Sequence, residues 1–399
     1  VKCIRKHRRF VKTKSCCIMF SVNNVIDKDI QSMLLPLSIL QILSCSPKYE
    51  IKNNVMRPNS FRTNTIFLCV VTLTISFLSY RVYVICQKPL VQNLKALLAN
   101  IIIEFVLFSI GLVINFTVNI LQMNRFLELI MMIQKVHSLL NDKFLFKRYV
   151  LCNWISVVIF CMVHGLSFIC FVSMTNIRLY IFFYTLGVIC FDVNTIYAIR
   201  LIKLLTDKVE LLNDQVQNLR NVDHDKLGLL CRNMFNAYVN ISKSYDFINM
   251  SYLFIFQILF NAVSFFIQVL MNWKVILDMG KFFKSDNVIP LSISTVFKFM
   301  SSLMIKGVVY QIILGFYCEA FYKATDKVLN VCALVLQSEC SEIEKRLCKN
   351  ILRVHRVNFN KMKICRMFYI DAKFPLKYIS LLANYIIVLI IFACDTRCQ

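Results

Sequence analysis

The sequence predicts an all-α integral membrane protein with seven membrane-spanning helices. Of the 399 residues, 58% are hydrophobic and only 17% are charged, whereas a soluble domain has about 25% charged residues to cover its surface. Only 7 glycines and 6 prolines are present, too few for a barrel built from many tight turns. Long apolar runs that are compatible with helices therefore favour a helical bundle.

Seven apolar runs approach the length of about 20 residues that a helix needs to cross a bilayer. We expect the spans at 65–85, 96–121, 150–174, 179–199, 251–271, 289–317 and 374–393. An eighth run, 33–45, is too short to span and contains Pro36. We expect an interfacial or re-entrant helix there.

The basic residues predict the orientation of the chain. With a cytoplasmic N-terminus, the inner segments 1–64, 122–149, 200–250 and 318–373 hold 35 Lys and Arg residues, and the outer segments hold 8. Cytoplasmic loops carry the excess of basic residues, so we expect the N-terminus inside and the C-terminus outside. The net charge of +24 is spread over these loops, so we expect no nucleic-acid partner.

These spans divide the chain into four expected parts. Residues 1–64 form a cytoplasmic N-terminal segment with the interfacial helix, and 65–317 hold the first six spans with their cytoplasmic helical loops. Residues 318–373 form further cytoplasmic helices, and 374–399 hold the seventh span and a short outer tail.

The cytoplasmic loops also have helical patterns. Apolar residues spaced by 4, 3, 4 and 3 form a seam for packing on another helix: Leu205, Val209, Leu212, Val216 and Leu219. We expect the fourth span to continue along this seam into the cytoplasm. Leu347, Ile351 and Val354 mark a second amphipathic stretch. The spacing alone allows either an oligomer core or packing within one subunit.

The sequence has no pattern of catalytic or metal-binding residues. The five histidines are isolated, and neither a nucleophile elbow nor a glycine-rich phosphate loop is present. The 18 cysteines are scattered through apolar stretches without zinc-ligand spacing, so most are expected to be packing residues. We therefore expect no enzyme, no metal and no cofactor.

Three ionisable residues fall inside expected spans, where a charge costs about 2.5–3.5 kcal/mol on insertion scales. Glu104 lies in the outer half of the second span, and Lys298 and Lys306 lie in the sixth. One interpretation is a buried Glu104–Lys298 contact. The alternative is that both lysines extend to the membrane interfaces.

The last span resembles the C-terminal helix of insect gustatory receptors, which has Thr-Tyr, five hydrophobic residues, then Gln-Phe. Here Asn384-Tyr385 is followed by five apolar residues and then Ile391-Phe392. Upstream, Phe368-Tyr369-Ile370-Asp371 resembles the family's aromatic-Ile-Asp stretch, and Cys318-Glu319-Ala320 with Thr325 resembles the segment after the sixth span. The detailed match covers about 75 residues.

The resemblance implies a ligand-gated cation channel for a small-molecule tastant in the plasma membrane of a sensory neuron dendrite. Four subunits, identical or mixed with other gustatory receptor subunits, would surround one pore, with membrane lipid outside. The resemblance places the pore and gate on the seventh span, at Asn384, Tyr385, Val388, Ile391 and Phe392. It makes the seam from Leu205 to Leu219 an oligomer anchor.

The resemblance also implies a ligand pocket in the outer halves of the second to sixth spans. Aromatic walls with a few polar groups suit a small organic molecule. The residues are Glu104, Phe105, Phe108, Phe168, Phe171, Tyr180, Phe183, Tyr184, Phe265, Gln268, Ser294 and Phe297. Where the family has Gln, this chain has Ile391, so a ring of Ile would dewet the pore constriction.

Three alternatives remain open at this stage. An insect odorant receptor shares the inverted seven-helix plan, but Tyr385 and Phe392 favour the gustatory branch. A G-protein-coupled receptor would need an outside N-terminus and an Asn-Pro-x-x-Tyr motif, and the last span has no such proline. A secondary transporter would show broken helices and inverted repeats, which are not found.

Overall fold

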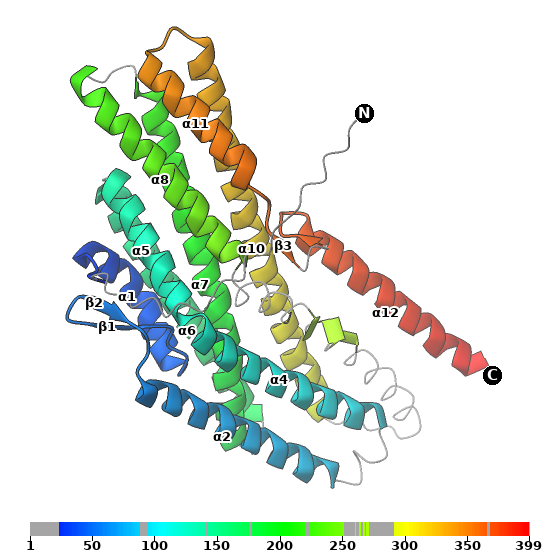
Figure 1. Ribbon diagram of the computed structural model, residues 1–399. Coiled ribbons are helices and arrows are strands. Elements are labelled where there is room, and N and C mark those ends of the chain that lie inside the picture. The colour runs from blue at the N-terminus through cyan, green and yellow to red at the C-terminus, as the bar shows by residue number, and fades with distance from the viewer. Residues whose placement is uncertain are drawn as a thin grey trace, which may run out of the picture.

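The computed structural model is a bundle of long helices (Figure 1). It describes residues 24–87, 95–140, 143–174, 178–219, 224–250, 291–364 and 368–398, with a few positions between 260 and 270. The N-terminal part consists of helix α1 (Lys28–Leu43), strands β1 (Glu50–Lys52) and β2 (Val55–Arg57), and helices α2 (Phe61–Cys86), α4 (Lys95–Leu121) and α5 (Met123–Leu140).

The remaining helices include two very long ones. They are α6 (Lys143–Met174), α7 (Arg178–Gln217), α8 (His224–Met250), α10 (Leu291–Gln337), α11 (Glu342–Asn358) and α12 (Phe374–Cys398), with strands β3 (Lys363–Ile364) and β4 (Phe368–Tyr369) before α12. At 1.5 Å per residue, α7 with 40 residues is about 60 Å long and α10 with 47 residues is about 70 Å long.

Six of the seven expected spans coincide with helices of the structure. The runs 65–85, 96–121, 150–174, 179–199, 289–317 and 374–393 lie in α2, α4, α6, α7, α10 and α12. The expected fifth span, 251–271, falls largely outside the described residues. The predicted continuation of the fourth span is confirmed, because α7 runs unbroken through the seam to Gln217.

Three of the described helices are long and apolar enough to cross a membrane: Phe61–Cys86, Leu98–Leu121 and Phe146–Ile169. Residues Phe374–Val388 of α12 form a shorter apolar stretch. Many apolar side chains on these helices point away from the protein; on α6, for instance, Val158, Ile159 and Met162 are 57–60% exposed. Lipid would cover such a surface, and the fold is that of an all-α membrane protein.

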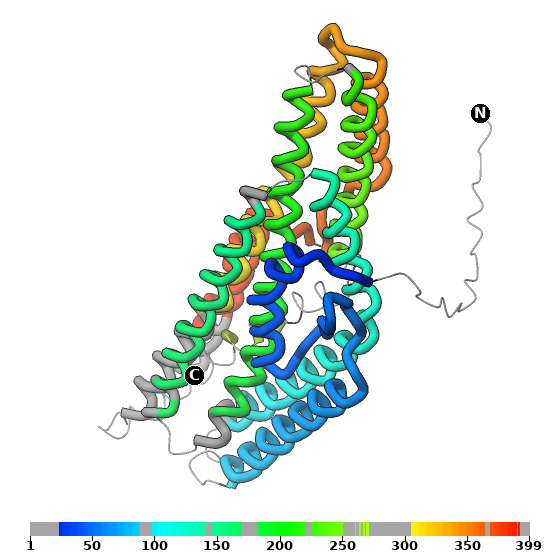
Figure 2. The backbone as a smooth tube through the Cα atoms, turned by 90° about the vertical axis from the view of Figure 1, so that its left-hand side faces the viewer, coloured from blue at the N-terminus to red at the C-terminus, as the bar shows by residue number. Residues whose placement is uncertain are grey.

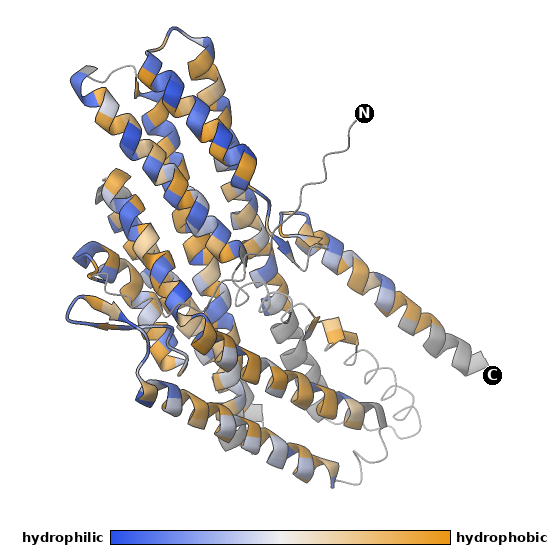
Figure 3. Ribbon diagram, viewed as in Figure 1, coloured by the Kyte–Doolittle hydropathy of each residue, from blue (hydrophilic) through white to orange (hydrophobic). Residues whose placement is uncertain are grey.

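The apolar helices lie at one end of the molecule and a polar stalk lies at the other. Figure 3 shows mainly hydrophobic residues on α2, α4 and the described part of α12, and mixed polar and apolar residues where α7, α8, α10 and α11 run together. A capping box at Ser341 and Glu344 starts α11, whose buried face includes Leu347 and Ile351 as the amphipathic pattern predicted.

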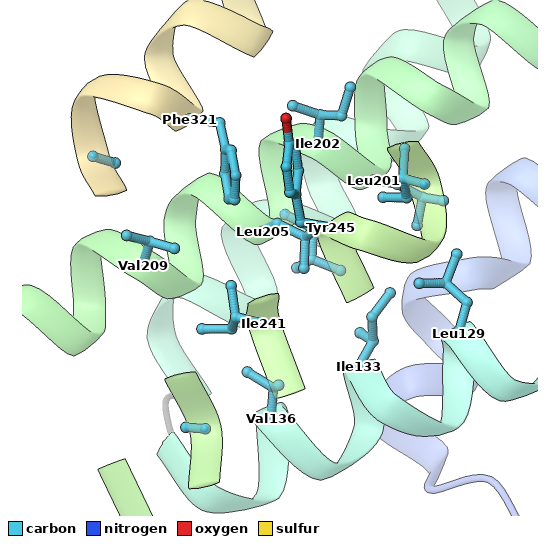
Figure 4. Packing of buried hydrophobic residues seen from close by; sticks show 14 of the residues in the cluster. Leu129, Ile133, Val136, Leu201, Ile202, Leu205, Val209, Ile241, Tyr245 and Phe321 are labelled. Carbon is cyan, nitrogen blue, oxygen red and sulfur yellow. The ribbon is translucent and has the colours of Figure 1, made fainter. Parts of the chain in front are cut away.

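The largest core cluster lies where α5, α7, α8 and α10 meet. Figure 4 shows side chains of α5, including Ile133, converging with Leu205 of α7, Tyr245 of α8 and Phe321 of α10. The short helix α1 joins this core and packs against α6 and α7, beside the β1–β2 hairpin (Figure 2). The expected helix near residues 33–45 is therefore present, with Pro36 buried within it.

Candidate ligand cleft and pore helix

A cleft opens between α2, α4 and α7. It has room for about one water molecule. Its lining residues are Leu78, Arg81 and Val82 of α2, Ile101, Glu104, Phe105 and Phe108 of α4, and Tyr184 of α7. Most of the wall is apolar, and three groups of the lining can form strong polar contacts: the Glu104 carboxylate, the Arg81 guanidinium and the Tyr184 hydroxyl.

The polar groups of the cleft are in contact with one another. The Tyr184 hydroxyl donates a hydrogen bond to Oε1 of Glu104 at 3.0 Å. Arg81 lies close enough for its charge to interact with both Glu104 and Tyr184. A carboxylate and a guanidinium on neighbouring spans thus offset each other's charge, which reduces the cost of placing them in a low-dielectric environment.

Aromatic rings pack the contact between α4 and α7 beneath these groups. The ring of Phe108 stacks on Tyr184 with centroids 5.1 Å apart and meets Phe191 edge-to-face at 5.6 Å. Gly187 makes the close approach possible, because a Cβ there would lie 2.5 Å from two ring carbons of Phe108. A second small residue, Gly111, faces the rings of Phe260 and Phe191 in the same way.

Of the predicted pocket residues, Glu104, Phe105, Phe108 and Tyr184 line the cleft. Phe168 packs against the adjoining apolar cluster, and Phe183 stacks on Phe77 at 4.5 Å. The others have side chains outside the described part of the chain: Phe171, Tyr180, Phe265, Gln268, Ser294 and Phe297. Their place in a pocket remains a prediction.

Sequence reasoning missed the contribution of α2. The predicted pocket takes no residue from the first expected span, 65–85, which contains Arg81. A signal was present, since Arg81 and Glu104 are opposite charges near the outer ends of consecutive spans. Only the packing of α2 along α4 and α7 brings them to one cleft.

A second polar cluster ties α6, α7 and α10 together within the spans. Nζ of Lys306 lies 2.5 Å from Oδ2 of Asp192, and Nε2 of His164 lies 3.2 Å from the same oxygen. The side chains of Asp192 and His164 are 11% and 6% exposed. Lys306 therefore does not extend to the interface as one interpretation expected, because a buried carboxylate holds it. The Lys298 side chain of the proposed Glu104 pair lies outside the described residues.

A third cluster surrounds Lys48, which is fully buried between α1 and β1. Its Nζ donates to Oδ1 of Asn194 at 2.5 Å and of Asn119 at 3.3 Å, and lies 4.9 Å from the centre of the Phe126 ring. Among the described residues no carboxylate forms an ion pair with Lys48. Burial accordingly lowers the pKa of Lys48 to about 7.

Comparison with known proteins shows a similarity of structure but none of sequence. Neither a protein-family model nor a curated protein sequence matches the chain. Among solved structures, the insect olfactory receptor OR5 from Machilis hrabei matches with a TM-score of 0.57 at 10% sequence identity, over 91% of this chain and 99% of that one. The chain has the insect olfactory receptor fold. This confirms the expected architecture of an insect chemoreceptor, and that structure is a receptor rather than an enzyme.

In this receptor fold α12 has two different faces. Leu382, Ile386 and Tyr378 pack toward Val269 and Val308, and Phe266 meets Tyr385 edge-to-face at 5.2 Å. The opposite face is exposed in the single chain: Asn384 is exposed, and Val388 and Ile391 are 46% and 53% exposed, while Tyr385, 49% exposed, lies beside the packed face. The Phe392 side chain lies outside the described part. The residues predicted to line a pore thus lie mainly on the face that no other described helix covers.

The predicted anchor seam lies in the interior of the chain. Leu205, Val209, Leu212, Val216 and Leu219 are each at most 2% exposed. They pack in the core formed with α5, α8 and α10, so they have almost no surface to offer a second subunit. Their role in oligomer assembly remains a prediction. Because the side chains are buried, they could affect assembly only by shaping the polar end of the molecule, where α7, α8, α10 and α11 run together.

Proposed function

We propose that the chain is a subunit of a chemosensory ligand-gated cation channel, a gustatory receptor that detects small organic molecules. The observation that carries this proposal is the insect olfactory receptor fold over 91% of the chain. The resemblance of the C-terminal motif supplies the channel activity and the taste assignment. The convergence of three polar groups, Arg81, Glu104 and Tyr184, among apolar helices supports the binding of a small ligand.

A continuous set of contacts connects the cleft with α12 in this proposal. Tyr184 of the cleft and Asp192 lie on α7, and Asp192 holds Lys306 of α10. Two residues after Lys306, Val308 belongs to the apolar cluster that contains Leu382 of α12. Ligand binding between α2, α4 and α7 would bias the position of α10 and thereby of the pore helix.

The taste assignment is weighed against an odorant receptor, which the fold match favours equally well. Tyr385 and Phe392, separated by six apolar residues, follow the gustatory pattern. We expect the subunit in the plasma membrane of a sensory neuron dendrite, as a homotetramer or together with other gustatory receptor subunits. The exposed apolar surface of α6 fits contact with membrane lipid.

The test is a recording of ligand-evoked cation current in a heterologous cell, with the chain alone and with partner subunits. An N-terminal epitope tag should be reachable by antibody only after permeabilisation, and protease added to intact cells should spare the segment 318–373. Cleavage near Arg353 by protease added outside would show that the orientation is the reverse of the predicted one, and it would contradict the channel proposal. A G-protein signal without current would favour the alternative of a G-protein-coupled receptor.

A further inference from the structure

Two of the apolar helices end beside each other: α2 begins at Phe61 and α4 ends at Leu121. The backbone N–H of Asn59, just before α2, donates to Sδ of Met123, just after α4, at 2.9 Å. Phe61 is 86% exposed and Leu121 is 74% exposed, the two most exposed large apolar side chains of the described residues. Acyl chains of the membrane would cover such side chains at the ends of two spans.

The hairpin of β1 and β2 places a basic residue at this boundary, because it lies directly before α2 (Figure 1). In the hairpin Ile51 pairs with Met56, and both side chains pack in the main core. Successive side chains of a strand point to opposite faces, so Arg57 points outward, and it is exposed.

Two further arginines come from the ends of the neighbouring helices. Arg62 is the second residue of α2, and Arg125 follows two residues after Met123. The contact of Asn59 with Met123 joins the two segments that carry them. We call Arg57, Arg62 and Arg125 the arginine cluster; all three side chains are exposed.

The charges of the arginine cluster are not neutralised by neighbouring carboxylates. Glu50 lies opposite Arg57 in the hairpin, and Glu128 lies one turn after Arg125. Within the described residues, however, no member of the cluster forms an ion pair with a carboxylate. Guanidinium groups bind phosphate through two parallel hydrogen bonds, so three of them at a membrane boundary suit a phosphorylated headgroup.

We propose that the arginine cluster binds the phosphate of an anionic phospholipid, whose acyl chains lie against Phe61 and Leu121. The exposed apolar side chains beside the cluster favour a lipid over a soluble phosphate. In the orientation proposed above this surface faces the cytoplasmic leaflet, which holds the anionic lipids of a cell membrane. The lipid site goes beyond the proposed function and does not require a channel.

The first test compares lipids on the purified full chain in mixed detergent micelles, by the shift of its thermal unfolding midpoint. We expect phosphatidylglycerol to raise the midpoint more than phosphatidylcholine does. Raising the salt to about 1 M should reduce the difference, because the Debye length falls from about 8 Å to about 3 Å. Equal shifts for the two lipids would overturn the proposal. Glycerol 3-phosphate giving the same shift as phosphatidylglycerol would also overturn it, in favour of a soluble phosphate.

The second test removes the charges of the arginine cluster. A basic residue near an anionic surface contributes about 1 kcal/mol, or about fivefold in affinity. The variant R57Q/R62Q/R125Q should therefore need roughly a hundredfold more phosphatidylglycerol for the same shift. Its midpoint without lipid should stay that of the parent, since the three side chains are exposed.

A matched control removes the same net charge elsewhere. The variant R346Q/K349Q/R353Q changes three exposed basic residues of α11, at the polar end of the molecule. It should keep the full response to phosphatidylglycerol. An unchanged response in R57Q/R62Q/R125Q, or an equal loss in both variants, would rule out a specific site at the arginine cluster.

The assay also separates the lipid site from the proposed channel, because it measures binding without current. A selective shift with phosphatidylglycerol in a chain that carries no current with any partner subunit would support the lipid site and contradict only the channel proposal.

Discussion

Tyr184 of α7 holds Glu104 of α4 by a hydrogen bond of 3.0 Å, and the ring of the same Tyr184 stacks on Phe108, one turn along α4. One side chain therefore provides a polar wall of the cleft and an aromatic part of the helix–helix contact below it. Burial of Tyr184 to 6% exposure leaves its hydroxyl little access to water, so the carboxylate is a needed partner. A change in the packing of Phe108 should therefore move Tyr184 and alter its hydrogen bond to Glu104.

Gly187→Ala tests this connection. The new Cβ would lie 2.5 Å from ring carbons of Phe108, so the ring has to move away from Tyr184. We expect a loss of about 1–3 kcal/mol in stability, as for other overpacked sites, measured as a lower thermal unfolding midpoint in detergent. Gly165→Ala on α6 is the control, because nothing lies within 4 Å of its Cβ.

A second substitution should repair the first. Phe108→Leu in the Gly187→Ala background removes the ring atoms that the new methyl group meets, so part of the lost stability should return. Equal midpoints for the parent and Gly187→Ala would show that α4 and α7 separate freely and that the glycine is not needed.

Lys306→Met tests the buried ion pair. Of the partners within the described residues, the carboxylate of Asp192 would keep His164 at 3.2 Å, and breaking one partner of a buried pair costs about 3–5 kcal/mol. We expect low surface expression and a lowered unfolding midpoint. The double variant D192N/K306M removes both charges and should recover most of the loss.

The control for this experiment is Lys203→Ala on α7. Its ion pair with Asp207 spans one helical turn at 2.7 Å, with side chains 33% and 22% exposed. Pairs of this kind contribute about 0.3–0.5 kcal/mol, so surface expression should hardly change. A K306M subunit as stable as its parent would mean that Asp192 finds another partner, and it would remove the pair from the proposed route between cleft and pore helix.

Lys48 predicts a pH dependence of stability. Its pKa is lowered to about 7 in the folded protein from an ordinary value of 10.5, so the folded state binds fewer protons between these values than the unfolded state does. Stability then rises with pH in this window, and the full cost of burying the charge remains below pH 7. The unfolding midpoint of the parent minus that of Lys48→Met should therefore increase from about pH 7 to 9.5, because only the parent loses the cost of a buried charge. Lys52→Met, at an exposed position of β1, should give a flat difference; a flat line for Lys48→Met would contradict the buried-amine assignment.

Ile391→Gln tests the proposal that the exposed face of α12 lines a pore. Ile391 is 53% exposed on the face that also holds Asn384 and Val388. A ring of Gln would offer water and cations hydrogen-bonding groups and lower the dewetting barrier, so we expect larger basal or ligand-evoked current at matched surface expression. Asn384→Ala should reduce the current. Ile386→Gln, on the face that packs toward Val269 and Val308, should only lower expression. Reduced expression of Ile391→Gln without a gain in current would assign that side chain to packing.

The sequence by itself determined the class of fold, because apolar length and the placement of basic residues depend on local composition. Six span positions, the continuation of α7 and the amphipathic α11 follow from periodicity that any helix of those residues must have. Glu104, Phe108 and Tyr184 were identified as aromatic and polar residues of the outer spans. The partners of Glu104 do not follow from the sequence, since the helical pattern says which face a residue occupies but not which helix covers that face.

Only the tertiary structure decided the partners. Arg81 reaches the cleft because α2 packs beside α4 and α7, Lys306 meets Asp192 because α10 runs along α7, and Lys48 is buried because α1 folds back onto α6 and α7. The seam from Leu205 to Leu219 is another example. Its spacing fits packing within one subunit or between subunits equally well, and only the structure shows that α5, α8 and α10 of the same chain bury it. The contacts of Lys306 with Asp192 and of Lys48 with Asn194 join residues 114 and 146 positions apart, so they depend on the three-dimensional arrangement of whole helices, which no local pattern encodes.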